Sequence, residues 1–303
     1  MNNVSQTASK SEGNATVWTL LLLLVTFTWG NAFVAIKNII EYVSPLELVA
    51  VRFIPVAIVF VALMAFRWRE ALKILRADGG RVALLGLTGG VLYNVFLAWG
   101  EVRVPAGTAS LIVALNPAFT YVLSVLFLDE TFTWQRTLGL AVAFAGLFVI
   151  VRWGSGQTIT LTDAGYALIT VLAPVCWAIY TVTGKGLVSR HPPFLVTGLA
   201  MTFAGLMSLV FVRPSLIAQL PDLPTSFWGS TLFLSLLCTV FAFAIWFGAL
   251  EWMPAGRVAS FVYLVPMFGV TFSSLLLDEP ITWGLGIGAL ILIGGVLLVN
   301  RGG

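Results

Sequence analysis

The chain alternates long apolar runs with short polar segments from residue 17 to residue 300. Each run is close to the roughly 20 residues that a helix needs to cross the hydrocarbon layer of a bilayer. The pattern therefore predicts ten membrane-spanning helices, at residues 17–36, 46–66, 82–100, 106–128, 134–151, 164–182, 194–212, 227–250, 257–277 and 283–300. The polar segment 1–16, rich in Ser, Asn and Thr, is predicted to be a disordered tail.

Composition supports this interpretation and excludes several other classes of protein. Hydrophobic residues make up 59% of the 303 residues and charged residues only 10%, whereas a soluble domain carries roughly 25% charged residues. The fold class is therefore an all-α integral membrane protein. The basic residues lie in short loops, where they set membrane topology, so we expect no nucleic-acid partner. With two cysteines inside apolar runs and a single histidine, His191, we expect no metal site and no cofactor.

A set of two prolines, an acidic pair and a tryptophan occurs twice in the same spacing. The first copy consists of Pro105-Ala106-Gly107, Pro117, Asp129-Glu130 and Trp134, and the second of Pro254-Ala255-Gly256, Pro266, Asp278-Glu279 and Trp283. The offset is 149 residues (254 − 105), and 17 of the 48 positions between 105 and 152 are identical in the second copy. Trp29 and Lys37 recur at an offset of 148 as Trp177 and Lys185. The chain is therefore an internal duplication.

The distribution of Lys and Arg predicts the orientation of the two copies. If the basic segment 67–81 lies in the cytoplasm, eleven basic residues lie inside and four outside, with Arg52 within a span. The excess predicts that both termini are cytoplasmic. Each copy contains five spans, an odd number, so the second copy must enter the membrane from the opposite side. Two inverted five-helix repeats around a central cavity are the architecture of many secondary transporters.

The motifs that carry the duplication also resemble a known family. Trp29-Gly30-Asn31-Ala32-Phe33 with Lys37, Ser44-Pro45-Leu46 with Arg52-Phe53, and the repeated Pro-Ala-Gly…Pro…Asp-Glu…Trp are similar to the ten-span branch of the drug/metabolite transporter superfamily, which is built from two EamA domains. The resemblance covers residues 17–152 and 163–301. It implies a ten-helix fold with a central cavity, and a permease that often exports metabolites, amino acids or drugs.

Arg52 is the candidate for recognition of a charged substrate. It lies about 10 Å into the second span at 1.5 Å per residue, where a guanidinium is costly and needs a partner. One hypothesis is a clamp on a substrate carboxylate; the alternative is a structural partner for Glu47 or for exposed carbonyls. Arg52 aligns with the apolar Ala200 in the second copy, so recognition there would be one-sided. Glu47 itself is expected to stabilise the start of its helix.

Other polar and aromatic residues near the middle of the spans are predicted to line the cavity. With Arg52, the candidates are Trp29, Asn31, Tyr93, Asn94, Asn116, Tyr121, Trp177, Tyr180, Trp246 and Tyr263. Ordinary packing is the alternative for any single aromatic residue among them. Pro117 and Pro266 each remove a backbone hydrogen bond in mid-span and are candidate gates. Gly139/Ala143 and Gly284/Gly288 predict close helix packing, between the fifth and tenth spans or across a homodimer.

These observations predict a secondary transporter, an exporter of small organic metabolites, in a bacterial cytoplasmic (inner) membrane. The acidic pairs are expected to mark helix ends, because no Asp or Glu lies in the middle third of any span. Proton coupling, if the protein has it, would use Glu47, Glu101, Glu251 or a proton of the substrate. An intramembrane enzyme is not expected, since the HExxH and GxSxG motifs and an embedded carboxylate pair are missing. A channel or a membrane sensor of small molecules is the alternative function. The expected partners are the substrate and the lipid bilayer.

Overall fold

The structure is a computed structural model that describes residues 2–127, 132–154, 161–252, 258 and 261–301. Side chains are described within these ranges except at residues 2–15, 161, 247, 250–252, 300 and 301. The first half contains α1 (Asn2–Ile40), α2 (Pro45–Met64), η1 (Ala65–Arg67), α3 (Trp68–Leu85), η2 (Gly86–Leu92), α4 (Tyr93–Glu101), α5 (Ala106–Val113), α6 (Asn116–Phe127) and α7 (Trp134–Trp153). The second contains α8 (Leu161–Val188), α9 (Pro193–Ser208), η3 (Leu209–Phe211), α10 (Pro214–Gln219), η4 (Leu220–Asp222), α11 (Thr225–Leu232), η5 (Phe233–Phe241), α12 (Ala242–Trp252), η6 (Phe261–Leu264), α14 (Val265–Leu276) and α15 (Trp283–Arg301).

Helices occupy the predicted span positions in the described part of the chain. Seven segments are long and apolar enough to cross a membrane, and one of them, Pro45–Glu101, contains two predicted spans. Two shorter apolar helices, Phe261–Leu276 and Trp283–Val299, occupy the last two predicted spans. The all-helical fold class is confirmed for these ranges, while the number of crossings stays a prediction. Helix α1 begins at Asn2, within the segment predicted as a tail; disorder of that segment also remains a prediction.

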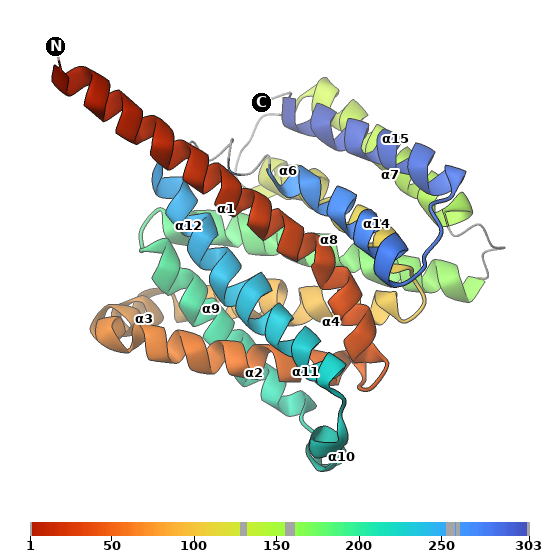
Figure 1. The fold of residues 1–303 in the computed structure, drawn as a ribbon, viewed down its shortest axis with the longest axis horizontal. Helices are drawn as coiled ribbons and strands as arrows, with labels where there is room; N and C mark the ends of the chain where they lie inside the picture. Colours follow the sequence, from red (N-terminus) through yellow and green to blue (C-terminus); the bar gives the residue numbers. More distant parts are fainter. Residues whose placement is uncertain (1, 128–131, 155–160, 253–257, 259–260, 302–303) are drawn as a thin grey trace.

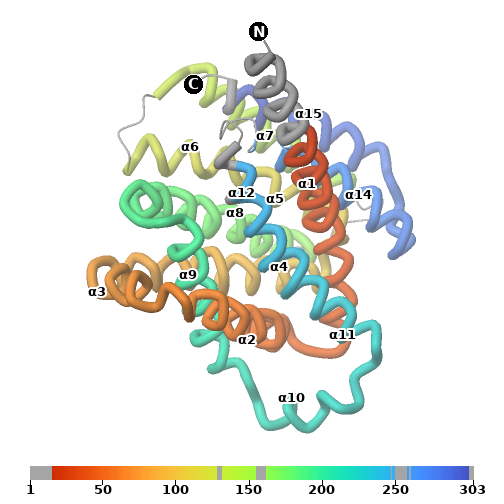
Figure 2. The backbone as a smooth tube through the Cα atoms, turned by 60° about the vertical axis from the view of Figure 1, so that its left-hand side comes forward, coloured from red at the N-terminus to blue at the C-terminus, as the bar shows by residue number. Residues whose placement is uncertain are grey.

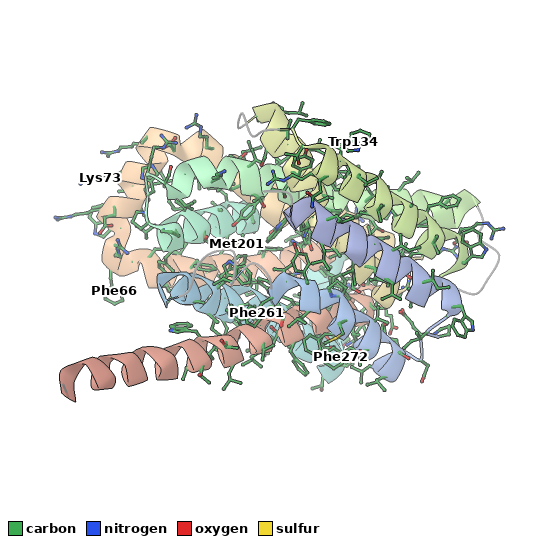
Figure 3. All side chains as sticks on the ribbon, turned by 90° about the horizontal axis from the view of Figure 1, so that it is seen from above. Phe66, Lys73, Trp134, Met201, Phe261 and Phe272 are labelled. Atoms are coloured by element: carbon green, nitrogen blue, oxygen red, sulfur yellow. The ribbon has the colours of Figure 1, made fainter. Side chains whose placement is uncertain are left out.

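The outer surface of the bundle carries large apolar side chains. Phe66 is 95% exposed and Trp134 is 74% exposed, whereas Met201 lies in the interior at 2% exposure (Figure 3). Soluble monomers rarely expose such residues in large contiguous patches. Lipid tails are the surroundings in which such a surface is stable, so the protein is a multi-pass membrane protein.

Helix α2 begins with a capping box. The Ser44 hydroxyl accepts a hydrogen bond from the Glu47 backbone N–H, and the Glu47 carboxylate accepts one from the Ser44 backbone N–H at 2.9 Å. Pro45 at the first helical position has no N–H to satisfy. The expected role of Glu47 at the helix start is therefore confirmed, and its carboxylate is not a partner of Arg52.

Helices α7 and α15 form a closely packed antiparallel pair at one edge of the bundle (Figure 1). Thr282, before α15, donates from its hydroxyl to the Gly154 carbonyl at 2.7 Å, next to the end of α7. A Cβ added to Gly139 would lie 2.7 Å from the Gly295 carbonyl oxygen. The predicted small-residue contact is thus confirmed between these two helices of one chain.

The other helix contacts follow a pattern that is preserved when the two halves are exchanged. Helix α2 packs antiparallel to its counterpart α9, since Phe60 near the end of α2 meets Phe194 near the start of α9. Two further sets of contacts come in matched pairs: α1 with α14 and α8 with α6, then α4 with α8 and α12 with α1. Figure 2 shows α2, α3 and α9 grouped on the side of the bundle away from α7 and α15. Two copies of one fold that pack in opposite orientations would produce such matched contacts.

An ion cluster joins the two halves at the start of the third predicted span. Asp78 interrupts the helical geometry of α3 with φ −136° and ψ 23°. Its carboxylate lies 3.2 Å from Arg190 and 2.9 Å from the His191 ring, both in the turn between α8 and α9, and 3.2 Å from Arg81. The hydrogen bond from His191, together with Arg190 and Arg81, lowers the pKa of Asp78 below its ordinary value of 3.8.

We predict that Gly146→Leu destabilises the protein by about 1–3 kcal/mol, the usual cost of overpacking a filled interface. A Cβ at Gly146 would lie 2.7 Å from Leu292 Cα and 2.8 Å from the Gly288 carbonyl oxygen. Thermal unfolding in detergent measures the effect. Gly286→Leu on α15 is the control, because a Cβ there meets no atom within 4 Å; equal melting temperatures for the two variants would contradict the packing argument.

The Asp78 cluster predicts a pH-dependent contribution to stability. Because the pKa of Asp78 is lower in the folded protein, its stabilisation is complete above the unfolded pKa and is lost as pH falls through the folded pKa. Asp78→Asn should therefore lower the melting temperature at pH 7, and the difference from the unmodified protein should vanish only once the pH falls below the lowered pKa of Asp78 in the folded protein. Asp222→Asn in an exposed segment is the control. A difference that is independent of pH would contradict the ionic role of Asp78.

Candidate functional site

The candidate site is centred on the guanidinium of Arg52 in α2. Its Nη1 donates to Asn94 Oδ1 at 2.7 Å, and its Nη2 donates to Thr239 Oγ1 at 3.3 Å. The guanidinium also lies 5.2 Å from the centre of the Phe53 ring. Asn94 belongs to the first half of the chain and Thr239 to the second. Arg52 therefore connects the two halves in the interior of the bundle.

Two π-helical segments occur at corresponding places in the two halves, and the partners of Arg52 lie in or next to them: Asn94 follows the first and Thr239 lies within the second. The segments are η2 (Gly86–Leu92) and η5 (Phe233–Phe241), and an offset of 149 carries Leu92 onto Phe241. A π-helical turn changes the backbone hydrogen-bond register and frequently marks a functional site. In a membrane interior, the carbonyls released in this way must find other donors.

Side chains at these segments supply the donors. Asn94 donates from its amide to the Gly90 carbonyl at 2.7 Å and to the Gly89 carbonyl at 3.4 Å. Thr239 donates to the Leu234 carbonyl at 2.9 Å, five residues before it. The oxygens that accept from Arg52 therefore belong to side chains that also hold the two irregular segments.

The structure decides between the two sequence interpretations of Arg52 only in part. Among the described residues, the partner is neither Glu47 nor a backbone carbonyl, because both hydrogen bonds of the guanidinium go to neutral side-chain oxygens. The Arg52 Nε is buried and has no hydrogen-bond acceptor among the described residues. Ser235 donates to the Arg52 carbonyl at 3.0 Å, so η5 also contacts the backbone of α2. The charge of Arg52 is thus held by polar groups but is not neutralised by an acidic side chain among them.

Two groups of aromatic side chains lie near this centre, one around Trp29 of α1 and the other around Trp177 of α8. Trp29 contacts Trp246 with tilted rings, 5.3 Å between centroids, and its Nε1 donates to the Cys238 carbonyl in η5 at 2.9 Å. Tyr93 contacts Trp177 at 5.4 Å, and Trp177 contacts Tyr180 at 5.2 Å. Trp29 and Trp177 are duplicated residues, and each packs against the π-helical span of the opposite half.

Glycines in η2 let the second aromatic group approach the backbone. A Cβ added to Gly89 would lie 2.8 Å from Cγ of the Tyr180 ring. The ring therefore occupies the space that a side chain at position 89 would need. The same glycine accepts a hydrogen bond from Asn94 through its carbonyl.

The remaining predicted site residues lie outside this group. The Tyr121 hydroxyl accepts from the Thr133 backbone N–H at 3.2 Å, and its ring lies 5.2 Å from the Arg136 guanidinium. Asn31 and Asn116 each have a buried Oδ1 without a hydrogen-bond partner in the described part of the chain. Tyr263 lies in the short helix η6. In the same described ranges, no hydrogen bond or ring contact links Tyr121 or Tyr263 to Arg52, and a role for any of these residues stays a prediction.

Pro117 and Pro266 lie at interruptions of their helices. Helix α5 ends at Val113 and α6 begins at Asn116, immediately before Pro117. Pro266 is the second residue of α14, which follows the 3₁₀ helix η6. Each proline therefore marks a break between two helices rather than a bend in one. Gating by these breaks remains a prediction.

Sequence reasoning missed the π-helical segments and the side chains of η5 that contact Arg52. Gly86, Gly89 and Gly90 were the only local signal in the first half, and Thr239 carries none of its own. Among the described residues, no group of three or more His, Cys, Asp or Glu could hold a metal ion. The acidic pair Asp129-Glu130, Glu251 and the motif Pro254-Ala255-Gly256 lie outside the described residues or side chains.

Known proteins resemble this chain along most of its length. The EamA-like transporter family matches residues 16–152 and 164–301. An uncharacterized transporter of Archaeoglobus fulgidus is 33% identical over 94% of this chain and 98% of its own length. A probable terminal-alkyne amino-acid exporter of Streptantibioticus cattleyicolor is 33% identical over 94% and 93% of the two chains.

Two further comparisons extend this result. A probable amino-acid metabolite efflux pump of Salmonella typhimurium is 29% identical over 92% of this chain and 93% of its own. A chain of a solved crystal structure superposes with a TM-score of 0.59 at 17% identity, covering 94% of this chain and 97% of its own. At that identity the superposition supports the fold alone.

We predict that Asn94→Leu destabilises the protein by roughly 2–3 kcal/mol, because it leaves the Gly90 carbonyl and a charged donor of Arg52 unpaired. Thermal unfolding in detergent measures the change. Thr271→Val is the control, since it removes only a hydrogen bond to Met267 on an exposed helix surface. A melting temperature for Asn94→Leu equal to that of the control would contradict a structural role of the amide.

Proposed function

Since this chain belongs to the EamA-like transporter family, we propose that it is a secondary transporter that exports small organic metabolites by alternating access. The substrates are amino acids or related amphipathic compounds that carry a carboxylate. The proposal includes ten spans in two inverted repeats, in a bacterial cytoplasmic (inner) membrane, with both termini in the cytoplasm. The antiparallel pairs α2–α9 and α7–α15 support the inverted arrangement.

The observation that carries the proposal is the charge of Arg52 between the two halves. A guanidinium in a membrane interior is costly unless it is paired. Its two hydrogen-bond partners, Asn94 and Thr239, are neutral. A carboxylate would supply the missing negative charge and can bind a guanidinium with two parallel hydrogen bonds. The substrate carboxylate would either replace Asn94 and Thr239 as hydrogen-bond partners of Arg52 or bind Arg52 together with them.

The aromatic groups support an amphipathic substrate. Trp29 with Trp246 and Tyr93 with Trp177 provide flat apolar surfaces that also carry a polar edge. Such surfaces suit the side chain of an amino acid whose carboxylate binds Arg52. The names of the relatives from Streptantibioticus cattleyicolor and Salmonella typhimurium, an amino-acid exporter and an amino-acid metabolite efflux pump, support the same class of compound.

Two connections between the halves support alternating access. At the start of the third predicted span, Asp78 of the first half binds Arg190 and His191 of the second. At the far end of that span, Glu279 of the second half accepts hydrogen bonds from the Ala106 and Gly107 backbone N–H groups of the first. Opening the protein to one side requires breaking one connection while the other persists. The substrate site would therefore open first at one end of the bundle and then at the other.

We predict that Arg52→Ala reduces transport of carboxylate-bearing compounds at least tenfold, whereas Arg52→Lys keeps part of it because it keeps the charge but loses the bidentate geometry. The measurement is uptake of radiolabelled L-phenylalanine, L-leucine and L-threonine into proteoliposomes. Phenylethylamine, which lacks the carboxylate, tests whether Arg52 recognises that group. Arg103→Ala changes an exposed arginine in the α4–α5 turn and is the control.

Three outcomes would count against this function. Unchanged flux in Arg52→Ala would assign Arg52 to structure alone. Currents of single-channel size would favour a channel, and binding of a compound without flux would favour a membrane sensor. Proteoliposomes that move none of the panel would contradict the proposed class of substrate.

A further inference from the structure

Glu101, the last residue of α4, has a buried carboxyl group that makes no hydrogen bond with the described residues. Its exposure is 0%, and neither carboxylate oxygen has a partner among the described residues. An ionised carboxylate in such a place would lose its hydration and receive nothing in return, which costs far more than burial of a neutral acid. The side chain is therefore stable in this conformation when it carries a proton.

The charges that face Glu101 come from two other elements. From α1, the Lys37 ammonium donates to the backbone carbonyl of Glu101 and, at 3.0 Å, to that of Val104. From the segment between α14 and α15, the Glu279 carboxylate accepts from the Ala106 N–H at 2.7 Å and the Gly107 N–H at 3.0 Å. Both Lys37 and Glu279 act electrostatically on Glu101. The residue of α8 against this end of α4 is Thr170, which is uncharged.

The balance of charge in this cluster also favours a protonated Glu101. Glu279 is stabilised as an anion by two backbone N–H groups at the start of α5. The charges of Lys37 and Glu279 then cancel, and an ionised Glu101 would leave one buried negative charge in excess. With a proton on Glu101, the cluster is neutral.

We propose that Glu101 is a proton-binding site whose carboxyl group releases its proton when the Glu279–α5 connection opens and takes it up again when that connection closes. The step is the ionisation of one carboxylic acid to a carboxylate and a proton. Opening removes Glu279 from the cluster and admits water, so that the Lys37 charge stabilises the carboxylate of Glu101. A small hollow lined by Pro105, Ser273 and Glu279 lies beside this connection.

The position of Glu101 also links the proton to the substrate site, and this step rests on the proposed function. Glu101 lies on the same helix as Asn94 and Tyr93, about 12 Å from Tyr93 at 1.5 Å per residue. Asn94 binds Arg52, so a movement of α4 that follows substrate binding also moves Glu101. Coupling then requires that Glu101 takes up its proton from the cytoplasmic side while the outer end is closed and releases it to the outer side on opening. One proton leaves with each exported substrate, so an acidic outer side opposes export.

Infrared spectroscopy of the reconstituted protein tests the proton site without any substrate. We expect a carbonyl stretch of a protonated carboxylic acid at neutral pH that disappears in Glu101→Gln and returns, shifted, in Glu101→Asp. Glu41→Gln is the matched control, because Glu41 is exposed in the turn after α1 and should leave the band unchanged. The absence of the band in the unmodified protein, or its persistence in Glu101→Gln, would overturn the proposal.

Transport driven by an imposed pH gradient tests the coupling. The probe is radiolabelled L-phenylalanine in proteoliposomes that contain the unmodified protein or Glu101→Gln. Because proton and substrate move in the same direction, we expect the unmodified protein to accumulate the probe on the side of higher pH. This dependence on the gradient should be at least tenfold smaller in the variant. Equal dependence in both would overturn the coupling. If the probe does not move at all, the proposed substrate class fails, and the infrared result still decides whether Glu101 holds a proton.

Discussion

The guanidinium of Arg52 can stay in the interior because two irregular helices place neutral acceptors around it. Asn94 and Thr239 hold the carbonyls of Gly90 and Leu234 and at the same time bind Arg52. In a bilayer, neither the charge nor the carbonyls could turn to water. The π-helical segments and the arginine therefore stabilise one another, and a change in one requires a change in the other.

Position 52 is a place in the bundle where the two halves of the duplicated fold differ in charge. Ala200, the counterpart of Arg52, packs against η2, where a Cβ at Gly86 would lie 2.5 Å from the Ala200 carbonyl oxygen. Arg52 meets η5 through the polar side chains of Ser235 and Thr239 instead. The same helix crossing is therefore apolar in one half and charged in the other. In the proposed transporter, the repeated halves would support two conformations, and the local difference at Arg52 would provide the place for the ligand.

Both ends of the bundle connect the halves by groups of opposite character. Asp78 forms ion pairs with exposed cationic side chains, so its contribution depends on pH and salt. Glu279 binds two backbone N–H groups at the start of a buried helix, so its bonds are short and directional. The sequence pattern suggested that the acidic pair of the second copy marks a helix end. The structure shows a further role for Glu279, which accepts hydrogen bonds from the N–H groups at the start of α5 in the other half.

The sequence by itself determined the class of the protein, its helices and its duplication, because hydrophobic length and repeated punctuation are properties of the chain alone. It also identified Arg52, Asn94 and Trp177 as unusual, since polar and amphipathic residues are few in a chain that is 59% hydrophobic. Tertiary structure alone decided which of them meet. The π-helical turns, Thr239 beside Arg52, and Glu101 between Lys37 and Glu279 depend on helices distant in sequence, whose packing fixes where an unsatisfied carbonyl or charge finds its partner.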